Sequence, residues 1–226
     1  MTSPPYNVGL SYDVTDDGIS YDKYLKFTKK WLSNVLHWTR PTGRLCLNVG
    51  LDKNKNGKHP VCADMTQLAK DVGWKYHATI IWNEGAMSRH TAWGSWMSAS
   101  APHVIAPVEV IIVLYKGEWK RSRPGETTIT RDEFMAWTKG VWQFSGARKN
   151  GHPAPFPREL PRRCIRLFSY RDDVVFDPFA GSGTTLVEAR NCGRDALGVE
   201  ISETYHEIAT KRLHAEICQA RLPSAT

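Results

Sequence analysis

The chain has 226 residues, of which 41% are hydrophobic, and this is enough for one packed domain. Its 30 Lys and Arg residues outnumber its 23 Asp and Glu residues, and the resulting net charge of +7 suits a polyanionic partner without requiring one. Five widely spaced cysteines without a Cys-x-x-Cys pair argue against a metal site, and the absence of a signal peptide or a long apolar run predicts a soluble intracellular protein.

The first half of the chain alternates helix and strand patterns. Apolar residues spaced three and four apart predict a helix over 21–38, which Pro41 and Gly43 end. A strand at 44–49, a polar loop at 52–58, a helix at 64–72 and a strand at 74–82 follow. Alternation of this kind is typical of a parallel sheet with crossover helices.

The strand predicted at 108–115 is the most β-branched run in the chain, and its continuous apolarity indicates burial on both faces. Residues 117–150 are rich in Lys, Arg, Gly and Trp and carry a short helix at 131–138. We interpret them as a surface insertion, not a sheet element, within a single domain over 1–226. Further along we expect strands at 173–176 and 196–199 and helices at 184–192 and 203–217.

A glycine-rich turn follows the strand at 173–176. Gly181 and Gly183 allow the backbone to approach a ligand closely, and the next helix points its N-terminal amides at the same place. Glu200 ends the following strand, where a carboxylate can bind ribose hydroxyls. The candidate cofactor-binding residues are Asp177, Pro178, Phe179, Ala180, Gly181, Ser182, Gly183, Thr184 and Glu200.

The charges of this turn narrow the class of ligand that it can bind. A phosphate loop is disfavoured because no Lys follows Gly183, and a dinucleotide is disfavoured because the carboxylate of Asp177 would repel its pyrophosphate. That carboxylate suits a ligand with an ammonium and a sulfonium group, as in S-adenosyl-L-methionine. A purely structural turn stays an alternative.

The N-terminal Ser3-Pro4-Pro5-Tyr6 could be a disordered tail, but its chemistry is specific. Two prolines fix an extended backbone and remove two N–H groups, which leaves carbonyl oxygens unpaired. The hydroxyl of Ser3 adds an acceptor, and the ring of Tyr6 offers a face for a base. Together these groups could hold an –NH2 group.

Ser-Pro-Pro-Tyr followed by Asp-Pro-Phe-x-Gly-Ser-Gly-Thr-Thr resembles the amino-methyltransferases of DNA, in the β-class order that puts the catalytic motif before the cofactor loop. His152, Pro153 and Phe156 are similar to the His-Pro element that wraps the methionine part of the cofactor in this family. The resemblance implies a Rossmann-like α/β fold, with a mostly parallel sheet and helices on both faces, and S-adenosyl-L-methionine as cofactor.

The resemblance also implies a mechanism in which the target base is rotated out of double-stranded DNA. Ser3 and the carbonyl of Pro4 would accept hydrogen bonds from its exocyclic amine, beside Pro5, and Tyr6 would stack on the base. Ser-Pro-Pro-Tyr favours N4 of cytosine. N6 of adenine, an RNA or protein amine, and a non-catalytic DNA-binding module stay open, and the family admits a homodimer and a cognate restriction endonuclease as partners.

Tryptophans are mixed with cations over 84–107 and 117–150, and we interpret 117–150 as a target-recognition insertion. Each single tryptophan is more simply explained by packing against the sheet. The candidate phosphate contacts are Lys116, Lys120, Arg121, Arg123, Arg148 and Lys149. The family normally has an apolar strand that leads into the Pro-Pro turn, whereas here only Met1 and Thr2 precede Ser3. We therefore expect a sheet without that strand, unless it is dispensable, was lost by truncation or is supplied by a partner.

Overall fold

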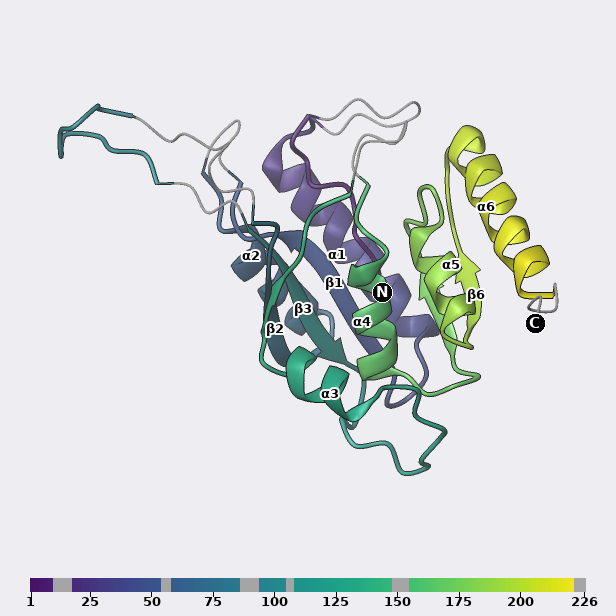
Figure 1. Ribbon diagram of the computed structural model, residues 1–226. Helices are drawn as coiled ribbons and strands as arrows, with labels where there is room; N and C mark the ends of the chain where they lie inside the picture. Colours follow the sequence, from purple (N-terminus) through teal and green to yellow (C-terminus); the bar gives the residue numbers. More distant parts are fainter. Residues whose placement is uncertain (10–17, 54–57, 86–93, 105–107, 148–154, 222–226) are drawn as a thin grey trace.

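The computed structural model describes residues 1–9, 18–53, 58–85, 94–104, 108–147 and 155–221 (Figure 1). Its helices are α1 (Tyr21–Trp38), α2 (Val61–Asp71), α3 (Arg131–Trp137), α4 (Glu159–Phe168), α5 (Thr184–Asn191) and α6 (Glu203–Arg221). Its strands are β1 (Arg44–Gly50), β2 (Lys75–Asn83), β3 (Glu109–Tyr115), β4 (Val141–Gln143), β5 (Val174–Asp177) and β6 (Asp195–Gly198). The helices and strands predicted from the sequence are all present, with ends that shift by at most four residues.

Four strands form one sheet in the order β1-β3-β2-β4, and β5 pairs with β6 in parallel. β3 is antiparallel to both β1 and β2, and β2 is parallel to β4, so β1, β2 and β4 run in one direction and β3 is reversed. In this register Tyr115 lies opposite Arg44 and Glu109 lies opposite Gly50. The start of β3 therefore lies beside the end of β1.

Helices cover both faces of the larger sheet, because alternate residues of a strand point to opposite faces. Leu47 of β1 and Ile112 of β3 point into a core shared with α1 and α2. Their neighbours Cys46 and Ile111 point into a second core with α3 and α4. β3 is buried along its central five residues, as its composition predicts, and each fully buried aliphatic side chain stabilises the fold by about 1.5–3 kcal/mol.

The segment predicted as a surface insertion contributes to the sheet, so that part of the interpretation is wrong. β4 extends the sheet beside β2, and Trp142 within it is 1% exposed, with its indole N–H donating to the carbonyl of Trp137 at 2.8 Å. Three residues are too few for an alternating pattern to show in the sequence. The packing expected of the tryptophans is confirmed for Trp137 and Trp142.

The first two residues lie between the two sheets. The amide of Thr2 donates to the carbonyl of Cys46 at 3.0 Å, and the amide of Asn48 donates to the carbonyl of Thr2 at 2.9 Å, which makes a parallel bridge with β1. On the other side, the amino group of Met1 donates to the carbonyl of Phe176 in β5 at 3.3 Å. The place where the sequence predicts a lacking strand is thus bridged by backbone of this chain.

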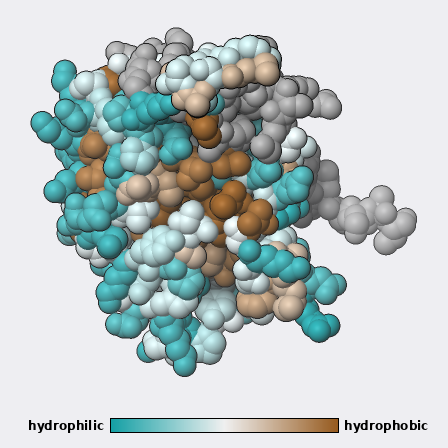
Figure 2. All heavy atoms as spheres, turned by 90° about the vertical axis from the view of Figure 1, so that its left-hand side faces the viewer, coloured by the Kyte–Doolittle hydropathy of each residue, from teal (hydrophilic) through white to brown (hydrophobic). Residues whose placement is uncertain are grey.

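α5 and α6 lie with β5 and β6, and α6 forms the outermost layer of that side (Figure 1). On the side where β2 lies, apolar surface gathers between hydrophilic margins (Figure 2). β2 and β4 contribute Ile81 and Val141, which are register partners and are both exposed. Within the described residues, every helix is too short or too polar to cross a membrane.

Candidate functional site

The Ser-Pro-Pro-Tyr segment and the glycine-rich turn meet in space. The hydroxyl of Thr2 donates to Oδ1 of Asp177 at 2.6 Å, across 175 positions of sequence, and the contact is buried. Ser3 follows Thr2 directly, and Asp177 is the last residue of β5. The N-terminal motif and the turn after β5 therefore border the same region at the ends of β1 and β5.

The turn after β5 has the backbone shape that its glycines allow. Gly181 and Gly183 have φ angles of +51° and +80°, which side-chain-bearing residues rarely adopt. A Cβ on Gly183 would lie 2.8 Å from the Cβ of Ala209 in α6. The amide of Gly181 donates to Oε2 of Glu200 at 2.7 Å, and Oε1 of Glu200 accepts from the amide of Ser202 at 2.9 Å. Glu200 therefore braces the turn, and its free lone pairs can still accept ribose hydroxyls.

Asp177 is 1% exposed and only partly satisfied. Its Oδ1 accepts from Thr2 and from the amide of Phe179 at 3.1 Å, whereas Oδ2 has no hydrogen-bond partner within the described part of the chain. Burial raises the pKa of this carboxyl above its ordinary value, whereas the nearby amino group of Met1 and the hydroxyls of Thr2 and Thr185 act in the opposite direction. An unpaired buried carboxylate oxygen is costly unless a ligand supplies a donor, so the site fits a ligand with a cationic amino group.

Two helices hold the turn from outside. The ring of Phe179 packs edge-on against Trp31 and Phe27 of α1, with centroids 5.3 and 6.1 Å apart. From α6, the guanidinium of Arg212 donates to the carbonyl of Ser182 at 2.5 Å and to its hydroxyl at 2.9 Å. These contacts fix the turn before any ligand binds, which lowers the entropic cost of binding.

The Ser-Pro-Pro-Tyr segment has a polar network of its own. The hydroxyls of Ser3 and Tyr6 lie 2.9 Å apart, and the hydroxyl of Tyr6 donates to Oε2 of Glu109 at 2.8 Å. Nδ2 of Asn48 donates to the same Oε2 at 2.5 Å and to the Tyr6 hydroxyl at 2.7 Å. Pro4 is buried. The hydroxyl of Tyr6 is therefore held in place, and whether its ring stacks on a base stays a prediction.

A family model described as DNA methylase, for the N6 and N4 enzymes, matches residues 1–211. This chain belongs to that family of DNA methylases. The methylase is 58% identical over 149 residues to the type II methyltransferase M.MjaVI of Methanocaldococcus jannaschii. The aligned region covers 66% of this chain and 77% of the relative. It is 30% identical to M.ScaI of Streptomyces caespitosus over 96% of this chain and 74% of that protein.

Solved structures agree with the fold. TTHA0409 of Thermus thermophilus, solved as a complex with S-adenosyl-L-methionine, has a TM-score of 0.73 and 29% identity over 96% of this methylase and 84% of its own chain. The cytosine-N4-specific PvuII DNA methyltransferase has a TM-score of 0.68 at 20% identity, covering all of this chain and 79% of its own. The predicted Rossmann-like methyltransferase fold is confirmed.

The remaining cofactor candidates are only partly placed. Phe156 packs against the core of the α3 and α4 face. His152 and Pro153 lie outside the described residues, as do Arg148 and Lys149 of the proposed phosphate contacts. Thr184 is 7% exposed and begins α5 directly after the turn, as expected. The role of these residues in cofactor binding stays a prediction.

Two of the cations predicted to contact DNA have partners within the methylase itself, and their contact with DNA stays a prediction. Nζ of Lys116 donates to the carbonyls of Leu36 and Thr39 at 2.8 and 2.7 Å, where it caps the end of α1. Arg121 forms a two-pronged ion pair with Asp173, which raises the pKa of the guanidinium. Lys116 and Arg121 come after Tyr115, the last residue of β3, whereas Glu109 is its first residue. The seven residues of β3 span about 20 Å, which separates these cations from Glu109.

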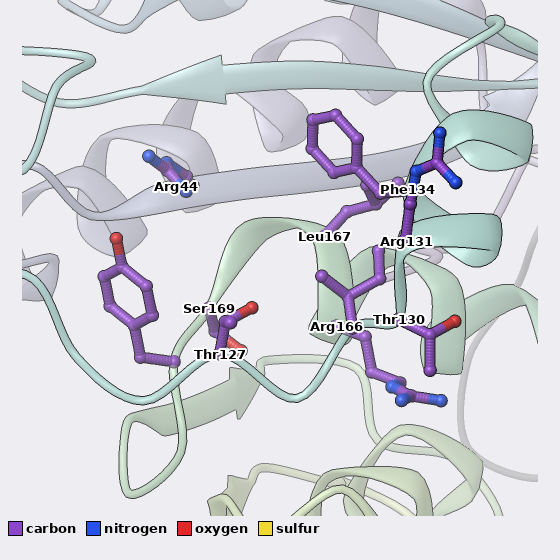
Figure 3. A pocket seen from close by; sticks show the side chains of 10 residues that line it. Arg44, Thr127, Thr130, Arg131, Phe134, Arg166, Leu167 and Ser169 are labelled. Carbon is purple, nitrogen blue, oxygen red and sulfur yellow. The ribbon is translucent and has the colours of Figure 1, made fainter.

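That far end also holds a cavity of about 410 Å³ (Figure 3). It is lined by Arg44 at the start of β1, Phe134 of α3, and Arg166 and Leu167 of α4. Arg44 donates to the carbonyls of Trp119 and Phe168, and Arg166 is paired with Glu133. The cavity is therefore separate from the region where Ser3 and Asp177 meet, and the ion pair with Glu133 neutralises the charge of Arg166.

Sequence analysis missed three residues of the site: Thr2, Asn48 and Glu109. Asn48 is 1% exposed within the otherwise apolar β1, and Glu109 opens the most apolar strand. A polar residue inside a buried strand needs a partner, which is a signal that the sequence does contain. It does not name that partner, because the partner comes from another part of the chain.

Proposed function

We propose that this DNA methylase transfers a methyl group from S-adenosyl-L-methionine to N4 of cytosine in double-stranded DNA. The observation that carries the proposal is the buried hydrogen bond between Thr2 and Asp177, which brings the amine-binding motif beside the cofactor turn. When bound, the cofactor supplies a methyl group on a sulfonium sulfur. The choice of cytosine is supported by Ser3, since Ser-Pro-Pro-Tyr is associated with N4 methylation in the family that this sequence resembles.

The cofactor end of the proposal is supported by Asp177 and Glu200. The unpaired Oδ2 of Asp177 would accept from the amino group of the cofactor, and Glu200 beside Gly181 would accept ribose hydroxyls. Charge-assisted hydrogen bonds of this kind contribute about 1.5–3 kcal/mol each. Residues of this chain thus select a positively charged, ribose-containing donor.

The target end is supported by Ser3 and Pro4. The hydroxyl of Ser3 and the carbonyl of Pro4 would accept hydrogen bonds from the two N–H groups of the target amine, which draws its lone pair out of conjugation with the ring and makes it available to the methyl group. The gain in the rate of methyl transfer comes mainly from positioning, because the two acceptors are fixed before the base binds. An accompanying restriction endonuclease is supported by the type II relatives, and a homodimer by the apolar surface on the β2 side (Figure 2).

The proposal is tested by incubating the chain with amplified, unmethylated DNA and S-adenosyl-L-methionine that carries a deuterated methyl group. The DNA is digested to nucleosides and analysed by mass spectrometry. We expect labelled N4-methyldeoxycytidine, and about 10²-fold less of it with the variant Ser3→Ala. Labelled N6-methyldeoxyadenosine would contradict the choice of base. Cofactor binding without any methyl transfer would favour a non-catalytic DNA-binding module instead.

A further inference from the structure

Glu109 is a carboxylate in the target half of the site to which no role has been given so far. It opens β3 beside the end of β1, and its Oε2 is within hydrogen-bond distance of both Tyr6 and Asn48. A partly buried carboxylate costs stability, since its charge is removed from water. Its position beside the amine-binding motif gives a functional reason for that cost.

The hydrogen bonds from Ser3 to Glu109 have a defined direction. An ionised carboxylate can only accept, so the hydroxyl of Tyr6 must donate to Glu109 at 2.8 Å. The oxygen of Tyr6 is then free to accept the hydroxyl proton of Ser3, 2.9 Å away. Ser3 is left with lone pairs and no proton to donate to a substrate. The carboxylate thus makes Ser3 an acceptor, as binding of an amine requires.

We propose that Glu109 is the final acceptor of the proton that the target amine releases, and that the proton reaches it through Ser3 and Tyr6. This proposal rests on the proposed function, because it needs an exocyclic amine beside Ser3. Glu109 is then a positioning residue that acts through two hydroxyls. It contacts neither the base nor the cofactor.

The step balances without an additional reactant. The lone pair of the amine nitrogen forms a bond to the methyl carbon as the carbon–sulfur bond breaks, and the electrons of that bond stay on sulfur. The nitrogen becomes cationic and gives a proton to Oγ of Ser3. The proton of Ser3 passes to Tyr6, and that of Tyr6 passes to Oε2 of Glu109. The products are a neutral methylated amine, two unchanged hydroxyls and a protonated carboxyl.

The surroundings of Glu109 suit this role. Burial raises the pKa of its carboxyl, and the nearby negative charge of Glu84 raises it further, whereas the hydrogen bonds from Tyr6 and Asn48 act in the opposite direction. A carboxylate with a raised pKa is a better proton acceptor near neutral pH. Burial also raises the pKa of Tyr6, so that its hydroxyl stays protonated and able to relay.

The decisive variant is Glu109→Gln, because an amide has nearly the same shape but is a very poor base. With cofactor and DNA both saturating, we expect single-turnover methyl transfer to fall by about 10²-fold, with cofactor Kd changed less than twofold. In the unaltered chain the rate should fall on the acidic side of the pH profile as Glu109 becomes protonated. That fall should disappear in the variant, and Glu109→Asp should retain part of the rate.

The variant Tyr6→Phe breaks the relay in the middle and leaves the carboxylate in place. If the relay acts as a unit, Tyr6→Phe combined with Glu109→Gln should be no slower than the slower single variant. If the fold-losses in rate of the two single variants multiply in the double variant, the relay is contradicted. Circular dichroism and thermal unfolding of each variant show whether it folds, and the pH profile of the conservative Glu109→Asp variant keeps the test valid where Glu109→Gln is unstable.

Glu84→Gln is the matched control. It removes a neighbouring carboxylate that is outside the relay, so the rate at neutral pH should be unchanged and the acidic fall should move to slightly lower pH. If the unaltered chain transfers no methyl group to DNA, the proposed function fails. If the unaltered chain is active and Glu109→Gln retains full rate and the acidic fall, only the relay fails.

Discussion

Asp177 makes two kinds of contact at once. One carboxylate oxygen binds the hydroxyl of Thr2 and the amide of Phe179, and the other is buried without a partner among the described residues. The first oxygen serves the structure, since it connects β5 to the N-terminal segment. The second is the oxygen that we propose accepts from the amino group of the cofactor, where its negative charge would select a cation.

These two contributions can be separated by two substitutions. Asp177→Asn keeps an oxygen that can accept from Thr2 but removes the charge, so the affinity for S-adenosyl-L-methionine should fall about 10- to 100-fold. Thr2→Val removes the hydroxyl and keeps the charge, so the affinity should change less than about threefold while stability falls by about 1 kcal/mol. Titration calorimetry and urea unfolding measure the two effects. Equal losses of affinity in both variants would refute the division.

At the scale of elements, the turn between β5 and α5 depends on close contact with α6. Gly183 has a φ angle of +80°, and a Cβ there would meet the Cβ of Ala209 at 2.8 Å. Gly140 has a similar φ angle of +73°, but no atom of the described residues beyond its chain neighbours lies within 4 Å of the position of its Cβ. The two glycines therefore share a backbone requirement and differ in the space around them.

This pair gives a matched prediction. Gly140→Ala should lower the free energy of unfolding by about 1 kcal/mol, which is the cost of placing a side chain in the left-handed region. Gly183→Ala should cost about 1–3 kcal/mol more, because α6 must also shift. It should weaken cofactor binding as well, which Gly140→Ala should not do. Urea unfolding measures the stability of both variants, and calorimetry measures their cofactor affinity. Equal losses in the free energy of unfolding would show that α6 shifts without strain.

Local sequence patterns predicted most elements but not how they pair. The apolar run of β3 indicated burial on both faces, and burial is a property of one strand alone. Its antiparallel pairing with β1 and β2 depends on the path of the chain through residues that carry no periodic signal. β4 was missed because three residues are too short a sample of any period.

The same distinction between local and long-range features applies to the residues of the site. The glycine-rich turn and Ser-Pro-Pro-Tyr were predicted because each is a continuous motif whose chemistry is local. Asn48 and Glu109 were missed because they meet the hydroxyl of Tyr6 only when β1 and β3 pair. The contacts of Lys116 with helix carbonyls were also not predicted, because a cation in sequence does not reveal which groups surround it.

At the scale of the whole molecule, the cations after β3 can still be tested for contact with DNA. Lys120 and Arg123 are exposed, and their contact with phosphates stays a prediction. If both bind phosphates, the combined variant Lys120→Gln, Arg123→Gln should reduce the slope of log affinity against log salt by about 1.8, or about 0.9 for each contact. Arg121→Gln should leave the slope unchanged, since Asp173 already neutralises that charge. Fluorescence anisotropy across a salt series measures the slopes, and an unchanged slope in the combined variant would exclude these contacts.

The bond between Thr2 and Asp177 also bears on when a newly made molecule can act. The two residues are separated by 175 positions, so the ribosome needs roughly 10 to 35 seconds to make the second after the first. Throughout that interval the nascent polypeptide contains the Ser-Pro-Pro-Tyr segment without the carboxylate that binds Thr2 beside it. On the proposed function, we therefore expect methyl transfer to become possible only late in translation, and a product that stops before residue 177 to be inactive on DNA.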